Sequence, residues 1–339
     1  MKNFWRFAAL SAASLLALAS LNACSEEEET TKSYLSGTIK ITFPSYVQEG
    51  YSKTFCIDSI STLNRDGDYT KIAYNFTDIH GTVDTLIDTD GNVKSKYFTI
   101  TAPDSLDSFS ASITGYATDY YTSSSTVTFY VVSDNKSLTG IRRSLTDTQF
   151  TDPRDNKTYW VTHPADGKAW MGQNLKFEGL GVPFMEENAM VNLLGNFYTW
   201  NEALQACPEG WHLPSDSEWT ALAGEYGGQT ADPLTPFIDI EGAAGALMAD
   251  VYFNDIKMWE YWPTVNISNA SGLAVIPAGY AVWNGSYSFA GYSYYAVFWT
   301  SDESGDQGIY RQIFDDQNII FCGGADKDSF LASVRCVRD

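Results

Sequence analysis

The sequence is poor in histidine and in basic residues. It contains 3 His, and its 21 Lys and Arg stand against 42 Asp and Glu, so the 339 residues carry a formal net charge of -21. So few histidines leave little room for a zinc site built from imidazoles. The acidic balance disfavours DNA, RNA and anionic lipid as partners. Hydrophobic residues make up 44% of the chain, which excludes wholesale disorder, and the length predicts two domains.

Apolar runs of membrane-spanning length are also missing. The run 7–18 is shorter than the ~20 residues a spanning helix needs. With Lys2 and Arg6 before it, this run predicts a signal peptide over residues 1–23. Leu21-Asn22-Ala23-Cys24 follows and resembles a bacterial lipobox, which implies a lipid on Cys24 as the membrane anchor.

Residues 24–33 contain four consecutive Glu and predict an extended acidic tether. Together with Ser25, this run is similar to the surface-export tethers of Bacteroidetes-type lipoproteins. The resemblance implies an outer-membrane protein exposed at the cell surface.

Residues 34–133 carry short strand patterns separated by turn residues. Polar and apolar residues alternate over 38–43, 71–76, 97–100 and 126–131, as in half-buried strands. About 100 residues of this pattern predict an all-β, immunoglobulin-like sandwich. Residues 134–146 are polar, include Arg142-Arg143, and are expected to form a linker.

Two capping boxes predict two short helices after the linker. Thr199 and Glu202 have the spacing that starts a helix ending before Pro208. Ser215 and Glu218 repeat it for a helix whose Trp219, Leu222 and Ala223 share one face. Residues 298–301, 309–313 and 333–338 are expected to be closing strands.

Six segments occur in an order typical of one known family. They are Asp152-Pro153-Arg154-Asp155, Trp170-Met171-Gly172-Gln173-Asn174-Leu175, Cys207-Pro208-Glu209-Gly210-Trp211-His212-Leu213-Pro214, Ser271-Gly272-Leu273, Pro277-Ala278-Gly279-Tyr280 and Val334-Arg335-Cys336-Val337. Over residues 147–339 the chain therefore resembles the Fibrobacter succinogenes major paralogous domain. Gly172 departs from the pattern, since the family usually has Ala there.

That family is similar to C-type lectin-like and formylglycine-generating-enzyme-like proteins. The resemblance implies an α+β domain with two short helices, a small antiparallel sheet and a long loop region at 228–297. It also implies a disulfide between Cys207 and Cys336, because lectin-like folds commonly join those two elements. Cys56 and Cys322 are left with two alternatives: a second disulfide across the domains, or two thiols.

No catalytic set, metal site or cofactor is expected. Trp283-Asn284-Gly285 lacks the acid of the strand that holds calcium in sugar-binding C-type lectins. The thiol–imidazole combination of Cys207 and His212 is rejected because Cys207 is expected to be oxidised.

Aromatic residues of the loop region are the candidate ligand-binding residues, because flat rings stack on sugars. They are Trp259, Trp262, Trp283, Tyr287, Tyr292, Tyr294 and Tyr295. The sequence thus favours a cell-surface lipoprotein whose lectin-like domain binds polysaccharide or a surface protein. The alternatives are a carbohydrate-active enzyme and a structural envelope component.

Overall fold

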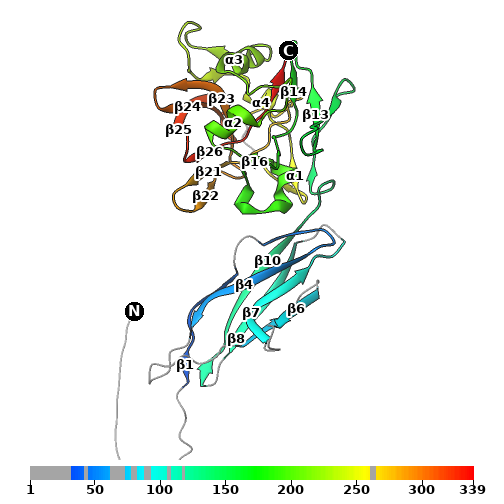
Figure 1. Ribbon diagram of the computed structural model, residues 1–339, viewed down its shortest axis with the longest axis vertical. Coiled ribbons are helices and arrows are strands. Elements are labelled where there is room, and N and C mark those ends of the chain that lie inside the picture. Colours follow the sequence, from blue (N-terminus) through cyan, green and yellow to red (C-terminus); the bar gives the residue numbers. More distant parts are fainter. Residues whose placement is uncertain are drawn as a thin grey trace, which may run out of the picture.

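The computed structural model describes residues 32–41, 45–61, 73–77, 82–87, 93–104, 108–116, 119–259 and 265–339. The signal peptide, Cys24, nearly all of the tether and Trp262 lie outside the described residues. Strands dominate the described part, and its helices are few and short. None of these helices has the length and apolar character needed to cross a membrane. Figure 1 shows two bodies, with the N-terminal strands below and the remaining elements above.

The N-terminal strands form two four-stranded sheets. One sheet has the order β3-β10-β8-β5 and the other β2-β4-β7-β6. Their bounds are β2 Ser36–Ile41, β3 Tyr46–Gln48, β4 Ser52–Ser61, β5 Ala73–Thr77, β6 Thr82–Ile87, β7 Val93–Thr101, β8 Ser108–Tyr116 and β10 Ser123–Val132. A parallel pair, β1 Ser33–Tyr34 and β9 Tyr120–Tyr121, accompanies them.

Strand alternation explains why the two sheets share one core. Phe55, Phe98 and Phe129 are buried together, with ring centroids 5.1 to 6.2 Å apart. On an outer face, hydroxyls pair across strands, for example Ser110 with Thr128 at 3.2 Å. An apolar inner face and a hydroxyl-rich outer face are what a period of two produces in a half-buried sheet.

The C-terminal part is built around a five-stranded antiparallel sheet in the order β17-β18-β25-β24-β23. Smaller sheets are β12-β13-β14-β27, β22-β21-β26, β11-β19-β20 and β15-β16. The bounds are β11 Leu138–Thr139, β12 Thr148–Thr151, β13 Thr158–Thr162, β14 Ala169–Met171, β15 Val182–Pro183, β16 Asn196–Phe197, β17 Gln229–Thr230, β18 Ile240–Glu241, β19 Tyr252–Phe253, β20 Ile256–Lys257, β21 Tyr280–Trp283, β22 Tyr287–Ala290, β23 Tyr295–Ser304, β24 Gln307–Phe314, β25 Ile319–Asp326, β26 Phe330–Leu331 and β27 Val337–Arg338.

Two of the helices begin where the capping boxes predicted. The helices are η1 Phe184–Glu186, η2 Asn188–Met190, α1 Val191–Leu194, α2 Trp200–Ala206, α3 Asp216–Gly224 and α4 Ala244–Leu247. Thr199 with Glu202 and Ser215 with Glu218 form both reciprocal hydrogen bonds of their boxes, which confirms the predicted starts of α2 and α3. Trp219, Leu222 and Ala223 are all buried, as their shared face predicted.

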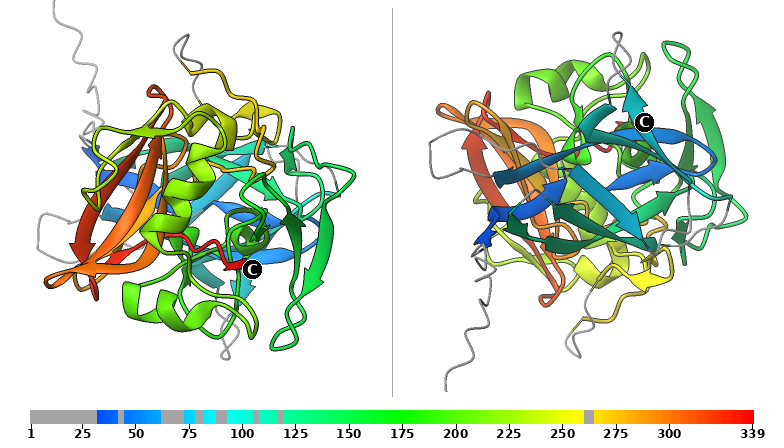
Figure 2. Two further views of the ribbon diagram at one scale, coloured as in Figure 1. Left: turned by 90° about the horizontal axis from the view of Figure 1, so that it is seen from above. Right: turned by 90° about the horizontal axis from the view of Figure 1, so that it is seen from below.

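The helices α2 and α3 cover opposite faces of the five-stranded sheet. Trp200 of α2 packs where Gly308 leaves room on β24, and Trp219 of α3 stacks on Phe298 with 5.3 Å between ring centroids. Gly308 and Arg311 point to opposite faces of β24, and Arg311 forms an ion pair with Asp216 of α3 at 2.6 Å. In Figure 2, the orange and red strands of this sheet stand together at one side, next to the green helices.

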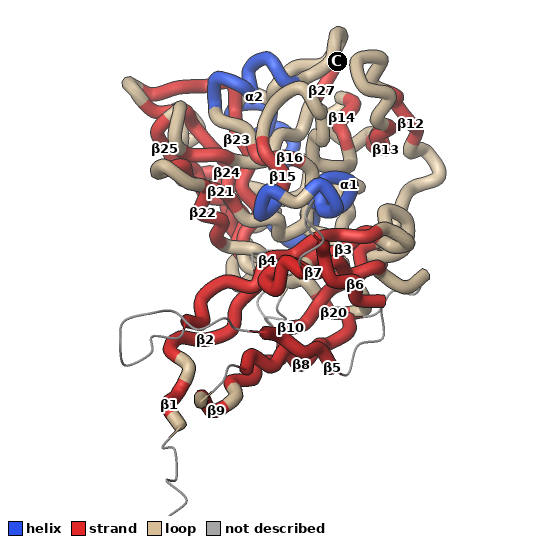
Figure 3. The backbone as a smooth tube through the Cα atoms, turned by 60° about the horizontal axis from the view of Figure 1, so that its bottom comes forward, coloured by secondary structure: helices blue, strands red, loops and turns tan. Residues whose placement is uncertain are grey.

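The residues expected to form a linker are packed into the C-terminal part. Leu138 and Thr139 form β11, which pairs with β19, and Ile141 packs against the core. The two parts also touch directly: Lys53 forms an ion pair with Glu187, and the rings of Tyr46 and Phe184 lie 6.4 Å apart. At this junction β3 contacts η2, which leads directly into α1, labelled above β3 in Figure 3.

Candidate functional site

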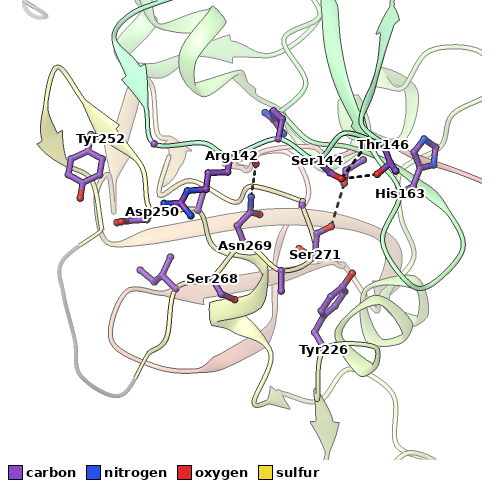
Figure 4. Close-up of a pocket in the computed structure, with 17 residues that line it drawn as sticks. Arg142, Ser144, Thr146, His163, Tyr226, Asp250, Tyr252, Ser268, Asn269 and Ser271 are labelled. Carbon is purple, nitrogen blue, oxygen red and sulfur yellow. Dashed lines mark hydrogen bonds between the residues drawn. The ribbon is translucent and has the colours of Figure 1, made fainter.

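A polar cavity of about 750 Å³ lies in the described part of the chain. Its walls come from the segment 140–146, the end of β13, the segment after α3, β19 and residues 267–272. This volume falls in the range of small-molecule sites. We call it the polar cavity (Figure 4).

Hydrogen bonds between segments distant in the sequence shape the walls of the polar cavity. Asn269 donates from Nδ2 to the carbonyl of Arg142 at 3.3 Å, and Thr162 Oγ1 donates to the carbonyl of Ser271 at 3.4 Å. Gly272 has a φ of +71°, and a Cβ there would lie 2.4 Å from Thr162 Oγ1. Only glycine fits this turn without strain, so the wall depends on it.

The polar cavity offers hydroxyl groups together with the guanidinium groups of Arg142 and Arg143. Hydroxyls of Ser144, Thr146 and Ser271 line it, and Figure 4 places Tyr226 and Tyr252 on different sides. Asp250 is the only carboxylate among its described lining residues, and it pairs with Lys257 at 3.1 Å. A pair of carboxylates for glycoside cleavage is therefore not assembled there.

The predicted aromatic residues do not line one groove. Trp283 is 45% exposed and lies against Tyr287, with ring centroids 4.6 Å apart on the β21–β22 hairpin. Tyr280 points to the opposite face of β21 and stacks with Tyr295 at 6.4 Å. Tyr294, 52% exposed, adjoins Tyr295. The candidates therefore divide between two surfaces.

One candidate is corrected by its burial, and a second packs near the junction. Trp259 is fully buried in the C-terminal core, so it cannot meet a ligand at the surface. Tyr292 packs on Phe184 with ring centroids 5.0 Å apart, and burial raises the pKa of its hydroxyl well above the ordinary value. Tyr46 of the N-terminal part also packs on Phe184, which places Tyr292 near the junction.

The tyrosines on the other surface belong to a longer series of rings. Tyr295 pairs with Phe314 at 4.8 Å, and Phe314 with Phe321 at 4.8 Å. In the other direction, Tyr280 stacks on Phe330 at 5.1 Å, and Phe330 on Tyr310 at 5.4 Å. We call these six half-buried residues the aromatic row: Phe321, Phe314, Tyr295, Tyr280, Phe330 and Tyr310.

Sequence reasoning missed most of the aromatic row and the polar cavity. Phe314 and Phe321 lie outside the aromatic-rich loop region, so the local density of aromatic residues in the sequence did not point to them. The one available signal was the alternation of β24, which places Tyr310 and Phe314 on the same face.

The cysteines separate into one disulfide and two thiols. Cys207 and Cys336 are joined, which confirms the predicted bond. Cys56 and Cys322 remain thiols, so the cross-domain disulfide is not formed. Burial, together with Asp216, raises the pKa of the Cys322 thiol to about 12, which disfavours a reactive thiolate. His212 contacts Glu218 at 2.8 Å, and Cys207 is oxidised.

Comparison with known proteins identifies the family. The Fibrobacter succinogenes major domain matches residues 164–338, just over half of the chain. The chain belongs to this family, as the ordered motifs predicted. No curated protein matches the chain.

Among solved structures, the adhesin InvE of Yersinia pseudotuberculosis is similar at 12% identity. The match covers 90% of this chain and 98% of the adhesin, with a TM-score of 0.21. A score this low carries no argument about fold or function.

Proposed function

We propose that the protein is an outer-membrane lipoprotein that binds polysaccharide at the cell surface. In this proposal Cys24 carries the lipid, residues 24–33 form the tether, and residues 34–133 form an immunoglobulin-like stalk. Residues 134–146 join the stalk to a C-type lectin-like binding domain over 147–339. A surface protein of the envelope is the alternative target.

The aromatic row is the observation that supports a binding role. Its rings follow one another across β25, β24, β23, β21 and β26, and all six stay partly exposed, although the sheet has a full core on its other face. Contiguous apolar surface of this kind is a feature of binding sites. Ring faces offer the apolar patches of a sugar a stacking partner, and the tyrosine hydroxyls offer hydrogen bonds.

An affinity experiment tests this proposal. The purified chain would be run through native gels containing neutral polysaccharides, beside Tyr294→Ala and Phe314→Ala. We expect retardation of the wild-type chain and at least about a tenfold loss of affinity in the variants, because central aromatic contacts dominate binding surfaces.

Tyr51→Ala is the matched control. Tyr51 is 68% exposed on the N-terminal part, so its loss removes an exposed ring without touching the aromatic row. The proposal would be contradicted if all three variants lost affinity for polysaccharide equally, or if no polysaccharide retarded the wild-type chain.

A further inference from the structure

A second cavity, which we call the junction cavity, is lined by residues that follow β10, beginning with Asp134 beside the junction of the two parts. It has a volume of about 200 Å³. An open groove of about 510 Å³ adjoins it. Cavity and groove share the residues Asp134, Trp160, Gln173, Lys176 and Asn192.

Three cations line the junction cavity of this strongly acidic chain: Arg143, Lys176 and Arg335. Arg335 is 1% exposed, and the hydrogen bonds described for its guanidinium go only to neutral oxygens. Its Nε donates to Asn174 Oδ1 at 2.7 Å, and Nη1 donates to the carbonyl of Leu273 at 2.6 Å. Burial, and then the charge of Arg143, hold the pKa of Arg335 well below its ordinary value. Arg335 thus adds a buried positive charge, and no carboxylate among the described residues is in contact with it.

The other two cations have donor capacity left. Arg143 donates from Nη2 to the carbonyl of Gly172 at 3.1 Å, while its buried Nη1 has no hydrogen-bond acceptor in the described part of the chain. The Lys176 ammonium lies 5.5 Å from the ring centroid of Tyr159 and forms none of the ion pairs found among the described residues. Burial lowers the pKa of both groups, that of Arg143 to about 10.

Asp134 is the only carboxylate among the described lining residues, and its charge partly offsets the effect of burial on the pKa of Lys176. Its Oδ2 accepts from Asn192 Nδ2 at 2.8 Å, and its Oδ1 accepts from Gln48 Nε2 at 3.3 Å. Buried cations without a paired anion destabilise a protein. A carboxylate placed among the three cations would offset that destabilisation and gain charge-assisted hydrogen bonds.

The remaining lining fits a sugar better than a bare ion. Gln173 accepts from the backbone N–H of Trp160 at 3.0 Å, which leaves its amide hydrogens as donors. The carbonyl oxygen of Asn192 is an acceptor for a hydroxyl. The indole of Trp160, half-buried in the wall, supplies an apolar face for a ring.

We infer that the junction cavity binds a carboxylate-bearing sugar, with the carboxylate held among Arg143, Lys176 and Arg335. This inference rests on the proposed carbohydrate-binding function and adds an acidic unit at a second place, apart from the aromatic row. A single sugar or a chain end fits better than a long polyanion, because the net charge of -21 repels a polyanion.

Isothermal titration calorimetry on the purified full chain tests the inference with glucuronate, galacturonate, glucose, acetate and phosphate. We expect both uronates to bind, and glucose, acetate and phosphate to bind at least about tenfold more weakly. Arg143→Gln and Lys176→Met should each weaken uronate binding at least about tenfold. Lys176 is partly exposed, so its variant remains informative if Arg143→Gln fails to fold.

Arg142→Gln is the matched control. Arg142 precedes Arg143 in the chain but lines the polar cavity and not the junction cavity, so uronate affinity should stay unchanged. Glucose binding as tightly as glucuronate, or unchanged affinity in both test variants, overturns the inference. If acetate or phosphate binds as tightly as glucuronate, the claim that the cavity recognises a sugar is overturned.

The two proposals fail separately. If Tyr294→Ala abolishes retention by neutral polysaccharide while uronates do not bind, this inference alone is wrong. If uronates bind as expected but no polysaccharide retards the chain, the proposed role of the aromatic row is wrong.

Discussion

Gly172 and Arg143 form a pair in which the smaller residue makes room for the larger. A Cβ on residue 172 would lie 2.6 Å from Arg143 Nη1. The family usually has Ala at this position. In this chain, Gly172 replaces it at the place where the Arg143 guanidinium lies. The guanidinium also lies 5.7 Å from the ring centroid of Trp160. The absence of a methyl group at residue 172 thus leaves room for the Arg143 guanidinium at the junction cavity.

Gly172→Ala should move Arg143 without unfolding the protein. Residue 172 is not among those with positive φ, so a side chain is conformationally allowed, and the atom in its way ends a flexible side chain. We expect the free energy of unfolding to change by less than about 1 kcal/mol. Uronate affinity should fall about tenfold if Arg143 holds the carboxylate. Urea unfolding and calorimetry measure the two effects.

Gly224→Ala is the control for this variant. No atom lies within 4 Å of a Cβ at residue 224, which closes α3. Its affinity for uronate should match the wild type. If Gly172→Ala lost more free energy of unfolding than free energy of uronate binding, the assigned role of Gly172 in making room for Arg143 would be contradicted.

Glu218 predicts how stability depends on pH. Burial alone would raise the pKa of its carboxyl, but hydrogen bonds from Ser215 and His212 outweigh burial and hold the pKa below its ordinary value. A depressed pKa contributes stability above the unfolded value of about 4.3 and loses it as pH falls through the folded pKa. Between pH 5 and pH 3, Glu218→Gln should therefore lose less free energy of unfolding than the wild type. Urea titrations at both pH values measure these losses, with the variant Glu225→Gln of an exposed residue as the control. Equal losses of free energy of unfolding in the wild type and both variants would contradict the role assigned to Glu218.

At the scale of elements, β25 accommodates the aromatic row through a glycine. A Cβ at Gly323 would lie 2.4 Å from the ring of Tyr310, which stacks on Phe330. The neighbouring Gly324 faces the other way, and a Cβ there would meet the end of the Gln307 side chain at 2.6 Å. The rigid ring of Tyr310 cannot move away from a new Cβ, whereas the flexible side chain of Gln307 can.

Gly323→Ala and Gly324→Ala therefore form a matched pair on one strand. We expect Gly323→Ala to lower the free energy of unfolding by about 1–3 kcal/mol through overpacking, and Gly324→Ala to lower it by less. Gly323→Ala should also weaken polysaccharide binding, because Tyr310 is displaced. Thermal and urea unfolding of both variants give the comparison, and equal losses would refute the packing argument.

Local signals in the sequence predicted some elements well. The capping boxes identified the starts of α2 and α3 because their hydrogen bonds join residues three apart. Aromatic density could not separate buried Trp259 from exposed Trp283, since that difference depends on neighbours distant in sequence. The junction cavity was unpredictable for the same reason: residues near 143, 176 and 335 meet only after folding.

At the scale of the whole molecule, the disulfide joins distant parts of the chain. Cys207 follows α2 and Cys336 precedes β27, with a sequence separation of 129 residues. The closed loop contains most of the C-terminal part, including the aromatic row. The covalent bond therefore restricts most of the C-terminal part in the unfolded state.

Removing the disulfide should lower stability strongly. For a loop of this length, chain entropy predicts a loss of about 5 kcal/mol in the free energy of unfolding, and measured losses run at about 2–5 kcal/mol. The variant Cys207→Ala/Cys336→Ala should show this loss in urea unfolding. Cys322→Ser, which removes a thiol without opening a loop, should lose much less. A loss below about 1 kcal/mol in the double variant would contradict the argument.

The parallel pairing of β3 with β10 has a mechanical consequence. Tyr46, Val47 and Gln48 align with Tyr130, Val131 and Val132 in the same direction. β10 then runs into residues 133–139, of which Leu138 and Thr139 pair with β19 of the C-terminal part. A load that pulls the N-terminus away from the C-terminal part makes β3 and β10 slide along each other. All their hydrogen bonds then bear the force together instead of opening one after another, so the molecule resists shear where a hairpin would peel open.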